Sequence, residues 1–381
     1  MGAFLTRAAR RLPYVAIGLV AAALLLPGTA AAATEFPDGY RAYHTYAEMV
    51  AALDKVVAAH PKIVRKFSIG RSYEGRQIWA AKISDNVATD ENEPEMMFDS
   101  LTHGREHLTV EMSLYLLRLL ANNYGSDARI TQLVRTREIF IVFMVNPDGG
   151  EYDISGGRFH FWRKNRQPIP GSSAIGVDPN RNFGFRWGCC GGSSGDPTKA
   201  TYRGPYPWYA PEVIAYRDFI KSRVIGGEQQ LRLAVSFHSS GAKILWPYGY
   251  TAIDVPSTMG ADDHAAFVAL ARAAANLNGY APMQASDMYI ADGTQHDWAY
   301  HAQGVIQLTF ELGPSGKVNF YPTGDRIGAL TKVNRAAVLY LLEQADCPWR
   351  AAGLAETHCI TTTAFAATAL SMPTRRGALP V

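Results

Sequence analysis

Two histidines and one glutamate are the residues of this chain whose types and positions point most clearly to chemistry. His103 and Glu106 lie three residues apart, where an apolar run ends and a helical pattern begins. His238 closes a second apolar run much later in the chain. Two imidazoles and one carboxylate, with a fourth position left to water, are a ligand set of catalytic zinc sites. Such a metal lowers the pKa of its water to about 7 and polarises a carbonyl oxygen, so the pattern predicts a hydrolase.

The His103–Glu106 pair is a weak signal when it stands alone, because two polar residues often recur at this spacing by chance. The same residues also suit a helix start, with Glu106 at the positive end of the helix dipole and His103 in an ordinary loop. His107 follows Glu106 directly, so the spacing differs from the His-Glu-x-x-His motif of the zincins. The metal hypothesis therefore depends on the rest of the chain.

The composition is that of an ordinary globular protein with ample apolar material for a core. The 381 residues suit one large domain or two average ones, with 48% hydrophobic and 19% charged residues. A net charge of +3 is small for this length, and no basic stripe with interleaved aromatic residues is visible. We therefore expect no nucleic acid among the partners.

The N-terminal residues have the pattern of a secretory signal peptide. Positive residues precede an apolar segment over 14–26, and small residues suited to cleavage occupy 30–33. The apolar segment is short for a membrane span, which needs about 20 residues, so an uncleaved anchor is the weaker alternative. Arg10-Arg11 hints at twin-arginine export, although ordinary secretion is favoured. We predict that residues 1–33 direct a secreted, extracellular protein without stable membrane association.

Four cysteines fit an oxidising compartment. Cys189 and Cys190 are adjacent, while Cys347 and Cys359 lie close together near the end of the chain. Four cysteines allow three connectivities, and the sequence does not choose among them. Local closure of Cys347 with Cys359 is the simplest pairing, and it leaves either a vicinal Cys189–Cys190 bridge or two free thiols.

The residues around the metal-ligand candidates form a regular series of predicted elements. Thr45-Tyr46-Ala47-Glu48 is a capping box and predicts a helix that runs to about His60. Strand patterns precede His103, and a long apolar helix follows it. The strands are predicted near 63–69, 77–83 and 96–101, and the helix at 107–124.

Strands and helices also alternate in the remainder of the chain. Residues 146–207 form a long irregular stretch rich in Gly, Pro, Asn and Arg, of a kind that is usually functional in a compact domain. The alternation predicts an α/β fold, with a mixed, largely parallel twisted sheet and helices on both faces. Strands are predicted at 138–145, 231–238 and 305–312, and helices near 210–222, 261–278 and 327–345.

The domain boundaries follow from these elements. We expect one domain over about residues 36–346. Residues 347–381 are rich in Ala and Thr and show no clear period. A flexible tail is the favoured interpretation of this segment, with a helical packing segment or a sorting signal as alternatives.

Further motifs follow the first one in a consistent order. They are Phe161-Trp162-Arg163-Lys164, Asp178-Pro179-Asn180-Arg181-Asn182, His238-Ser239-Ser240, Trp246-Pro247-Tyr248-Gly249, Asp287-Met288-Tyr289-Ile290 and Thr309-Phe310-Glu311-Leu312. Together with His103-x-x-Glu106, they resemble the zinc metallocarboxypeptidases typified by pancreatic carboxypeptidase A, and especially secreted bacterial members such as carboxypeptidase T. The resemblance spans about residues 38–346. Each motif alone also has a plain structural interpretation, but their joint order favours a site.

The resemblance implies one zinc ion per chain, bound by His103, Glu106 and His238. Asp178 matches the carboxylate that accepts a hydrogen bond from the first histidine. Such a bond fixes the imidazole tautomer and raises its basicity.

The resemblance also implies the chemistry of the reaction. Glu311 falls at the family's general base, which deprotonates the attacking water and passes the proton to the leaving amine. Arg163 falls at the arginine that stabilises the oxyanion, and such preorganised charge is often the largest catalytic term. The expected reaction is hydrolysis of the last peptide bond of peptides or proteins with a free C-terminus.

Four further residues match substrate-binding positions of the family. Asn180 and Arg181 resemble the pair that grips the terminal carboxylate, which a planar guanidinium can bind as a bidentate fork. Arg105 matches a more remote substrate-binding arginine. Tyr289 resembles the mobile tyrosine that closes over the bound substrate.

The preference for the terminal side chain is less clear from the motifs. His296 falls at the floor of the family's side-chain pocket, where an aliphatic residue goes with apolar substrates and an acid with basic ones. Asp292 lies nearby in sequence and is expected to attract Lys or Arg, whereas Gly249 carries no acid. We expect a broad pocket that favours bulky apolar or aromatic residues and tolerates basic ones.

Three other interpretations use similar residues. A zinc peptidase of cell-wall peptides would share the metal ligands, and a non-catalytic binding module would keep only the fold. A deacylase of amino-acid derivatives is the third, but Tyr289 with Asn180 and Arg181 favours a peptide. We expect a monomer. Calcium is a further candidate cofactor because bacterial relatives bind it, although the chain shows no EF-hand loop.

Overall fold

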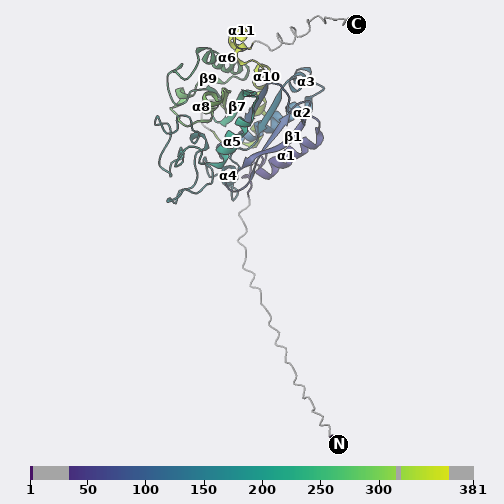
Figure 1. Ribbon diagram of the computed structural model, residues 1–381, viewed down its shortest axis with the longest axis vertical. Helices are drawn as coiled ribbons and strands as arrows, with labels where there is room; N and C mark the ends of the chain where they lie inside the picture. Colours follow the sequence, from purple (N-terminus) through teal and green to yellow (C-terminus); the bar gives the residue numbers. More distant parts are fainter. Residues whose placement is uncertain (3–33, 315–318, 360–381) are drawn as a thin grey trace, which may run out of the picture. The chain divides into compact units, whose positions relative to one another are not determined.

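The computed structural model describes residues 1–2, 34–314 and 319–359 (Figure 1). The described residues from 34 onward belong to one unit. Nearly all of the predicted signal peptide and the last part of the predicted tail, residues 360–381, lie outside the described residues. Among the described helices, none has the length and apolar character that crossing a bilayer requires.

An eight-stranded sheet forms the centre of the fold, with the strand order β1-β2-β4-β3-β7-β10-β8-β9. The neighbouring strands β4, β3, β7 and β10 are parallel to one another, whereas β2 and β8 each join this group antiparallel. The predicted mixed, largely parallel sheet is therefore confirmed. The strands span Val64–Arg71 (β1), Gln77–Ile83 (β2), Glu95–Asp99 (β3), Glu138–Val142 (β4), Leu231–Ser239 (β7), Lys243–Trp246 (β8), Ala281–Gln284 (β9) and Ile306–Leu312 (β10). A separate hairpin consists of Val224–Ile225 (β5) and Glu228–Gln229 (β6).

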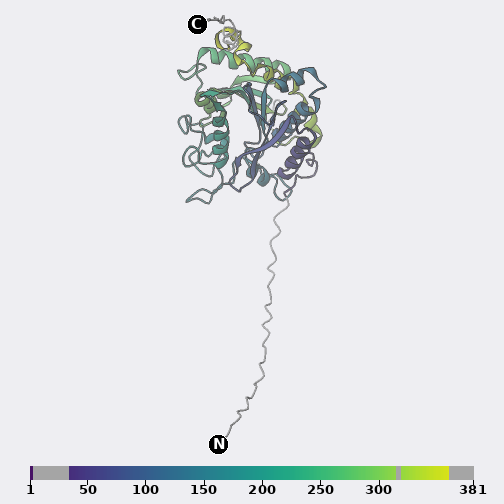
Figure 2. The same cartoon turned by 45° about the vertical axis from the view of Figure 1, so that its right-hand side comes forward.

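Helices cover both faces of the sheet, as Figure 2 shows in a turned view. The longer helices are Tyr46–Ala59 (α1), Leu108–Asn123 (α2), Ala128–Arg135 (α3), Pro211–Ser222 (α5), Ala261–Asn278 (α6), Gln295–Gln303 (α8) and Arg335–Gln344 (α10). The shorter ones are Pro147–Asp153 (α4), Ala285–Met288 (α7), Ile327–Lys332 (α9) and Ala355–His358 (α11), with 3-10 turns at Pro179–Arg181 (η1), Gly324–Arg326 (η2) and Pro348–Ala352 (η3).

The side chains of each strand alternate between the two faces, which explains why both faces carry helices. In β3, Met96 and Phe98 belong to the core that α1, α2, α6 and α10 cover. Met97, between them, belongs to the core that α5 and α8 cover. All three residues are fully buried, so an apolar strand of this kind is expected in the middle of the sheet.

Most predicted elements appear within a few residues of their predicted ends. The capping box of α1 is present, with the Thr45 side chain and the Glu48 side chain each bound to the other residue's backbone N–H. The helix predicted over 327–345 is divided into α9 and α10. At the division, the buried Asn334 side chain donates to Leu330 O (3.0 Å) and Tyr280 Oη (3.2 Å). Such side-chain bonds compete with the regular helical pattern.

The ordered C-terminal part extends beyond the predicted domain end at residue 346. The 3-10 turn η3 packs against α6, where Trp349 Nε1 donates to Asp263 Oδ1 at 2.8 Å. A disulfide joins Cys347 to Cys359, and a second joins the adjacent Cys189 and Cys190. For residues 347–359, the structure therefore shows the packed helical segment that the sequence offered as an alternative to a flexible tail.

Candidate functional site

The three predicted metal ligands converge at one buried point. His103 Nδ1 lies 2.8 Å from Glu106 Oε1, and His238 Nδ1 lies 3.0 Å from Glu106 Oε2. The two Nδ1 atoms are 3.2 Å apart. All three side chains are buried, at 2–3% exposure. The structure thus brings together the set that the sequence predicted, although one member is more than a hundred residues from the others.

The parallel strands explain this convergence. His103 lies in the turn that follows β3, Glu106 lies just before α2, and His238 lies near the end of β7. Because β3 and β7 are neighbouring parallel strands, their carboxyl ends meet at one edge of the sheet, where α/β proteins place their sites. Gly104 permits the close packing of the turn, since an added Cβ would lie 2.4 Å from the backbone of Gly149.

The donor set fits a metal ion of the zinc type. Facing Nδ1 atoms at 3.2 Å cannot both carry a proton, so at least one imidazole lone pair and the Glu106 carboxylate point at the same place. Burial and the positive charge of Arg163 lower the pKa of His103, which favours the neutral, metal-binding imidazole. Burial alone would raise the pKa of Glu106, but His103 and His238 hold it well below its usual range. Two neutral imidazoles with one carboxylate are the ligands of catalytic zinc sites.

Asp178 connects the ligand set to Arg163. Its Oδ1 lies 3.2 Å from His103 Nε2, and its Oδ2 accepts a hydrogen bond from Arg163 Nε at 2.8 Å. The Asn180 backbone N–H donates to Asp178 Oδ1 at 2.9 Å. Burial opposes ionisation, but Arg163 and His103 outweigh it and keep the pKa of Asp178 well below its usual range. Asp178 therefore lies where the predicted partner of the first histidine should be, as an anion.

Glu311 reaches the same edge of the sheet from the adjacent strand. It is the Cα partner of His238 in the parallel pair β7–β10, so both side chains project from one face. Glu311 is partly exposed. The pKa of Glu311 is raised to about 7, mainly by burial. The positive charge of His238 opposes this rise, and the negative charge of Glu106 adds to it. A carboxyl group with such a pKa is suited to accept and return a proton near neutral pH.

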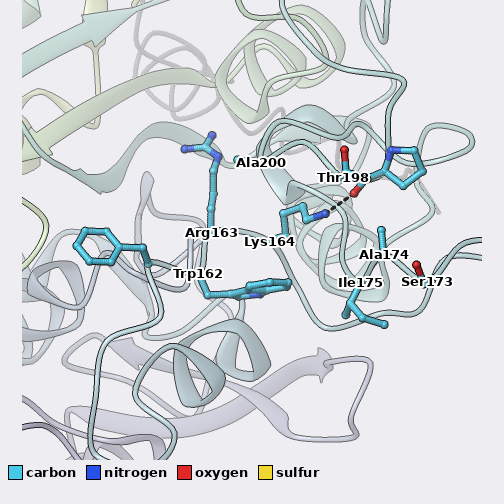
Figure 3. Close-up of a pocket in the computed structure, with 10 residues that line it drawn as sticks. Trp162, Arg163, Lys164, Ser173, Ala174, Ile175, Thr198 and Ala200 are labelled. Atoms are coloured by element: carbon cyan, nitrogen blue, oxygen red, sulfur yellow. Dashed lines mark hydrogen bonds between the residues drawn. The ribbon is translucent and has the colours of Figure 1, made fainter.

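Arg163 also borders a cavity of about 350 Å³ (Figure 3). The walls are formed by residues 161–164, 173–175, 197, 198 and 200. In Figure 3, the Arg163 guanidinium points away from the Trp162 ring, and Lys164 Nζ donates to Pro197 O at 2.7 Å. The cavity therefore begins at a predicted catalytic residue and has a largely apolar wall.

The predicted carboxylate-binding residues lie next to Asp178 in the short turn η1. Asn180 Oδ1 accepts a hydrogen bond from the Gln295 backbone N–H at 2.8 Å. Arg181 Nη1 donates to the Asn180 carbonyl at 2.6 Å. The Tyr289 ring centre lies 5.8 Å from Arg181 Cζ, and the Tyr289 side chain is 51% exposed. The turn thus presents an amide and a guanidinium beside an exposed phenol.

Arg105 lies apart from this group. Its guanidinium carbon is 4.2 Å from the ring centre of Phe320. Burial and the charge of Arg163 lower the pKa of Arg105. Arg105 is therefore close enough to Arg163 to feel its charge, while its guanidinium stacks on the ring of Phe320.

His296, the predicted floor of the side-chain pocket, is buried beside Thr309 and Asp297. His296 Nδ1 lies 3.4 Å from Thr309 Oγ1, and its Nε2 lies 3.1 Å from Asp297 Oδ1. A Cβ added to Gly249 would be 3.4 Å from His296 Nε2 and 3.1 Å from the Ala291 carbonyl. A side chain at residue 249 would therefore crowd both the imidazole and the Ala291 carbonyl.

Asp292 differs from its predicted role. Its side chain is fully buried and accepts hydrogen bonds from the backbone N–H groups of Cys190 and Gly192, both at 3.0 Å, and from the Ser193 hydroxyl. The carboxylate is therefore occupied by a loop of the protein. Its contacts do not support the expectation that it attracts a basic substrate side chain.

A buried polar network behind the ligands was not predicted from the sequence. Asp99 accepts hydrogen bonds from Ser236 Oγ (2.7 Å), Tyr216 Oη (3.1 Å) and Gln295 Nε2 (2.8 Å). Burial raises the pKa of Asp99 to about 6. The one available signal was a carboxylate inside the apolar run before His103, which is costly to bury without partners. The partners come from three distant segments, so the sequence did not reveal them.

Comparisons with known proteins identify the family of this chain. The sequence profile of the family described as "Zinc carboxypeptidase" matches residues 49–337. The zinc carboxypeptidase of Saccharothrix mutabilis subsp. capreolus is 45% identical over 329 residues, which cover 84% of this chain and 73% of that protein. Human carboxypeptidase A1 is 34% identical over 307 residues, 80% of this chain and 70% of that one.

Solved structures give the same result for the fold. The crystal structure of carboxypeptidase A from Helicoverpa armigera superposes with a TM-score of 0.69 and 26% sequence identity. The match covers 82% of this chain and 75% of that chain. The resemblance stated from the motifs is therefore confirmed, and the family implies zinc as the cofactor and peptides as substrates. From its sequence, its fold and the arrangement of its buried ligand set, this chain belongs to the zinc carboxypeptidase family of peptide-bond hydrolases.

Proposed function

We propose that this protein is an exopeptidase that releases the C-terminal residue of peptides outside the cell. The observation that carries the proposal is the arrangement of segment 178–181. Asp178 at its start contacts His103 and Arg163, whereas Asn180 and Arg181 at its end present groups suited to a carboxylate. One rigid turn thus fixes the distance between the hydrolytic centre and the group that recognises a chain end.

His103, Glu106 and His238 are proposed to hold the zinc ion. When bound, zinc supplies Lewis acidity and lowers the pKa of a water molecule. The protein keeps the three ligands buried and, through Asp178, keeps the His103 ring in one orientation.

Glu311 and Arg163 are proposed to carry the proton and charge movements. Glu311 takes a proton from the attacking water and gives it to the leaving amine, for which a pKa of about 7 is suitable. Arg163 is anchored by Nε to Asp178, and no described residue accepts a hydrogen bond from its Nη groups. These groups are therefore available to a developing oxyanion.

Asn180 and Arg181 are proposed to bind the terminal carboxylate of the substrate. Because Asn180 Oδ1 is occupied by the Gln295 N–H, its Nδ2 amide remains as a donor. In the described part of the chain, no acceptor lies on Arg181 Nη2. Tyr289 is exposed beside this guanidinium and is proposed to close over the bound residue, while Arg105 contacts the substrate further from the cut.

The pocket at His296 and Gly249 is proposed to favour bulky apolar or aromatic terminal residues. Gly249 adds no side chain beside the imidazole, and the carboxylate of Asp292 is occupied by hydrogen bonds from the protein. Asp297, the buried acid beside His296, is likewise occupied by the backbone N–H groups of Gly249 and Tyr250. Lys and Arg therefore lack a free buried acid to pair with, and we expect them to be released more slowly.

A panel of N-blocked dipeptides ending in Phe, Leu, Arg or Glu tests this function, together with the C-terminal amide of each. Mass spectrometry of a longer peptide identifies which bond is cut. Release of the last residue alone, fastest for Phe or Leu and much slower for the amides, is the expected result. Cleavage at internal bonds, or equal rates for acids and amides, would contradict an exopeptidase.

Export and oligomeric state are also proposals. The two disulfides support an oxidising compartment, in agreement with the signal-like N-terminus. We expect active protein in the culture supernatant and a monomer by light scattering. Activity that stays inside the cell would contradict secretion, and a dimeric mass would contradict the monomer.

Calcium is proposed to bind at a second acidic cluster, formed by Asp90, Glu95 and Glu138. Their carboxylate oxygens lie within 4.8 Å of one another, and Glu138 Oε2 is buried without a described hydrogen-bond partner. Lys82 and Arg223 already pair with Glu138 and Glu95, so calcium competes with two cations. We expect added calcium to raise the melting temperature of the wild type but not that of Glu138→Gln. If calcium does not raise the wild-type melting temperature, the proposed calcium site is wrong.

A further inference from the structure

The carboxylate of Asp292 organises a loop that lies about a hundred residues earlier in the chain. Its Oδ2 accepts the backbone N–H groups of Cys190 and Gly192, and its Oδ1 accepts the Ser193 hydroxyl. Asp292 is fully buried, and the described hydrogen bonds to it all come from this loop. Three donors converging on one anion make a charge-assisted set, which is stronger than neutral hydrogen bonds.

The same loop holds Arg181. The Gly192 carbonyl accepts a hydrogen bond from Arg181 Nε at 3.1 Å. Together with the Nη1 bond to the Asn180 carbonyl, this contact fixes the plane of the guanidinium. No described residue accepts a hydrogen bond from Nη2, which is the group assigned to the substrate carboxylate in the proposed function. The orientation of the guanidinium thus depends on two carbonyl groups, and that of Gly192 belongs to the loop that Asp292 holds.

The loop that carries the Gly192 carbonyl packs closely against the segment that carries Asp292. A Cβ added to Gly192 would lie 2.5 Å from Ala291 Cα and 2.6 Å from the Asp292 backbone nitrogen. The loop backbone therefore lies directly against the segment that carries Asp292. On the other side, Gly293 packs on the Arg181 backbone, since a Cβ there would lie 2.6 Å from the Arg181 carbonyl. The segment 291–293 is thus enclosed between the loop and Arg181.

We propose that Asp292 is a positioning residue for recognition of the substrate's terminal carboxylate. It acts through the Gly192 carbonyl, which orients Arg181, and it does not touch the substrate. This inference rests on the proposed role of Arg181. It assigns to Asp292 a function in affinity for the chain end, in place of a function in selecting basic side chains.

Asp292→Asn tests the proposal in the full-length, zinc-loaded enzyme. The amide keeps one acceptor oxygen but removes the negative charge that the three donors share, so its hold on the loop weakens and the Gly192 carbonyl should shift. We expect KM for an N-blocked dipeptide acid to rise roughly tenfold, because a hydrogen bond to a charged group is worth about that factor. The kcat should stay within about threefold, and binding of the matched amide, measured as competitive inhibition, should not change.

Asp148→Asn is the matched control. Asp148 is also buried and also holds a surface turn, accepting hydrogen bonds from Ser72 Oγ (2.7 Å) and the Glu74 N–H (2.7 Å). A general loss of stability would appear in both variants, whereas the rise in KM should appear only in Asp292→Asn. An unchanged KM in Asp292→Asn, or an equal loss of affinity for acid and amide, would overturn the proposal.

Gly192→Ala provides an independent variant with the carboxylate intact. Its methyl group must displace the loop from residues 291–292, so the same selective rise in KM is expected. If Asp292→Asn does not fold, a wild-type KM in Gly192→Ala overturns the proposal. Arg181→Ala separates the proposed grip of Arg181 on the terminal carboxylate from the proposed positioning role of Asp292. If it does not distinguish acid from amide, the proposed grip itself fails. If it does and the other variants do not, only the role of Asp292 is lost.

Discussion

Replacing Asp178 by Asn is expected to weaken zinc binding without changing any proposed metal ligand. The carboxylate lies 3.2 Å from His103 Nε2 and accepts hydrogen bonds from Arg163 Nε and the Asn180 N–H. Asn has nearly the same shape, so the perturbation is mainly the loss of one negative charge. The imidazole loses its anionic partner, and the buried Arg163 loses its ion-pair partner.

The size of the effect follows from these contacts. A carboxylate that orients a metal-bound histidine is worth about 10- to 100-fold in metal affinity. That range corresponds to roughly 1.4–2.8 kcal/mol. The pKa of Asp178 lies well below its usual range because Arg163 and His103 outweigh burial, so the wild-type group is ionised at neutral pH. Since the substitution removes both ionic contacts, we expect a loss near the upper end of the range.

Competition with a chromogenic zinc chelator near neutral pH measures the affinity. Asp148→Asn is again a suitable control, because Asp148 is buried and pairs with Arg76 at 2.8 Å as Asp178 pairs with Arg163. Zinc affinity should be unchanged in the control. A wild-type zinc affinity in Asp178→Asn would refute the reasoning, because it would show that the contact to His103 does not support the metal site.

Three further predictions concern catalysis and stability. Glu311→Gln should keep zinc but lower kcat at least about a hundredfold. The fall of kcat/KM at low pH, where the base becomes protonated, should also disappear in this variant. A kcat above a tenth of the wild-type value would show that Glu311 is not the general base. Burial raises the pKa of Glu212 to about 7 from an ordinary 4.5, so ionising it costs stability as pH rises through 4.5 to 7. Relative to Glu212→Gln, the wild type should lose roughly 3 kcal/mol of unfolding free energy between pH 5 and 8 in urea titrations, and parallel pH profiles would contradict this. Replacing Cys347 and Cys359 by Ser should lower the unfolding free energy by about 3 kcal/mol, the value for a loop of this length, and an unchanged denaturation midpoint would show that the bridge adds nothing.

Strand periodicity placed His103 and His238 at strand ends, and the joint order of the motifs, with the resemblance that it carries, selected them together with Glu106 as metal ligands. His103 and His238 each follow an apolar run, and β3 and β7 proved to be parallel neighbours. The boundaries of β2 over Gln77–Ile83 were also predicted correctly. Local patterns carry this information, because alternation and capping act within a few residues.

Elements that depend on distant partners were not predicted. The strands β8 and β9 have four residues each, too few for a periodic signal. In the sheet, β8 pairs with β10, and β9 pairs with β8. Asp292 was interpreted as a free acid because nothing near it in sequence reveals the N–H groups of Cys190 and Gly192. Buried polar groups need partners, but the sequence does not say which ones.

Zinc dependence of chain-end hydrolysis tests the central claim most directly. The purified enzyme would be analysed for zinc by mass spectrometry and assayed with an N-blocked dipeptide ending in Phe, before chelation, after chelation and after zinc is restored. The account predicts one zinc per chain, release of free Phe, loss of activity with the metal and recovery with zinc. Hydrolysis that persists in metal-free enzyme, or folded zinc-loaded enzyme that releases no terminal residue, would contradict it.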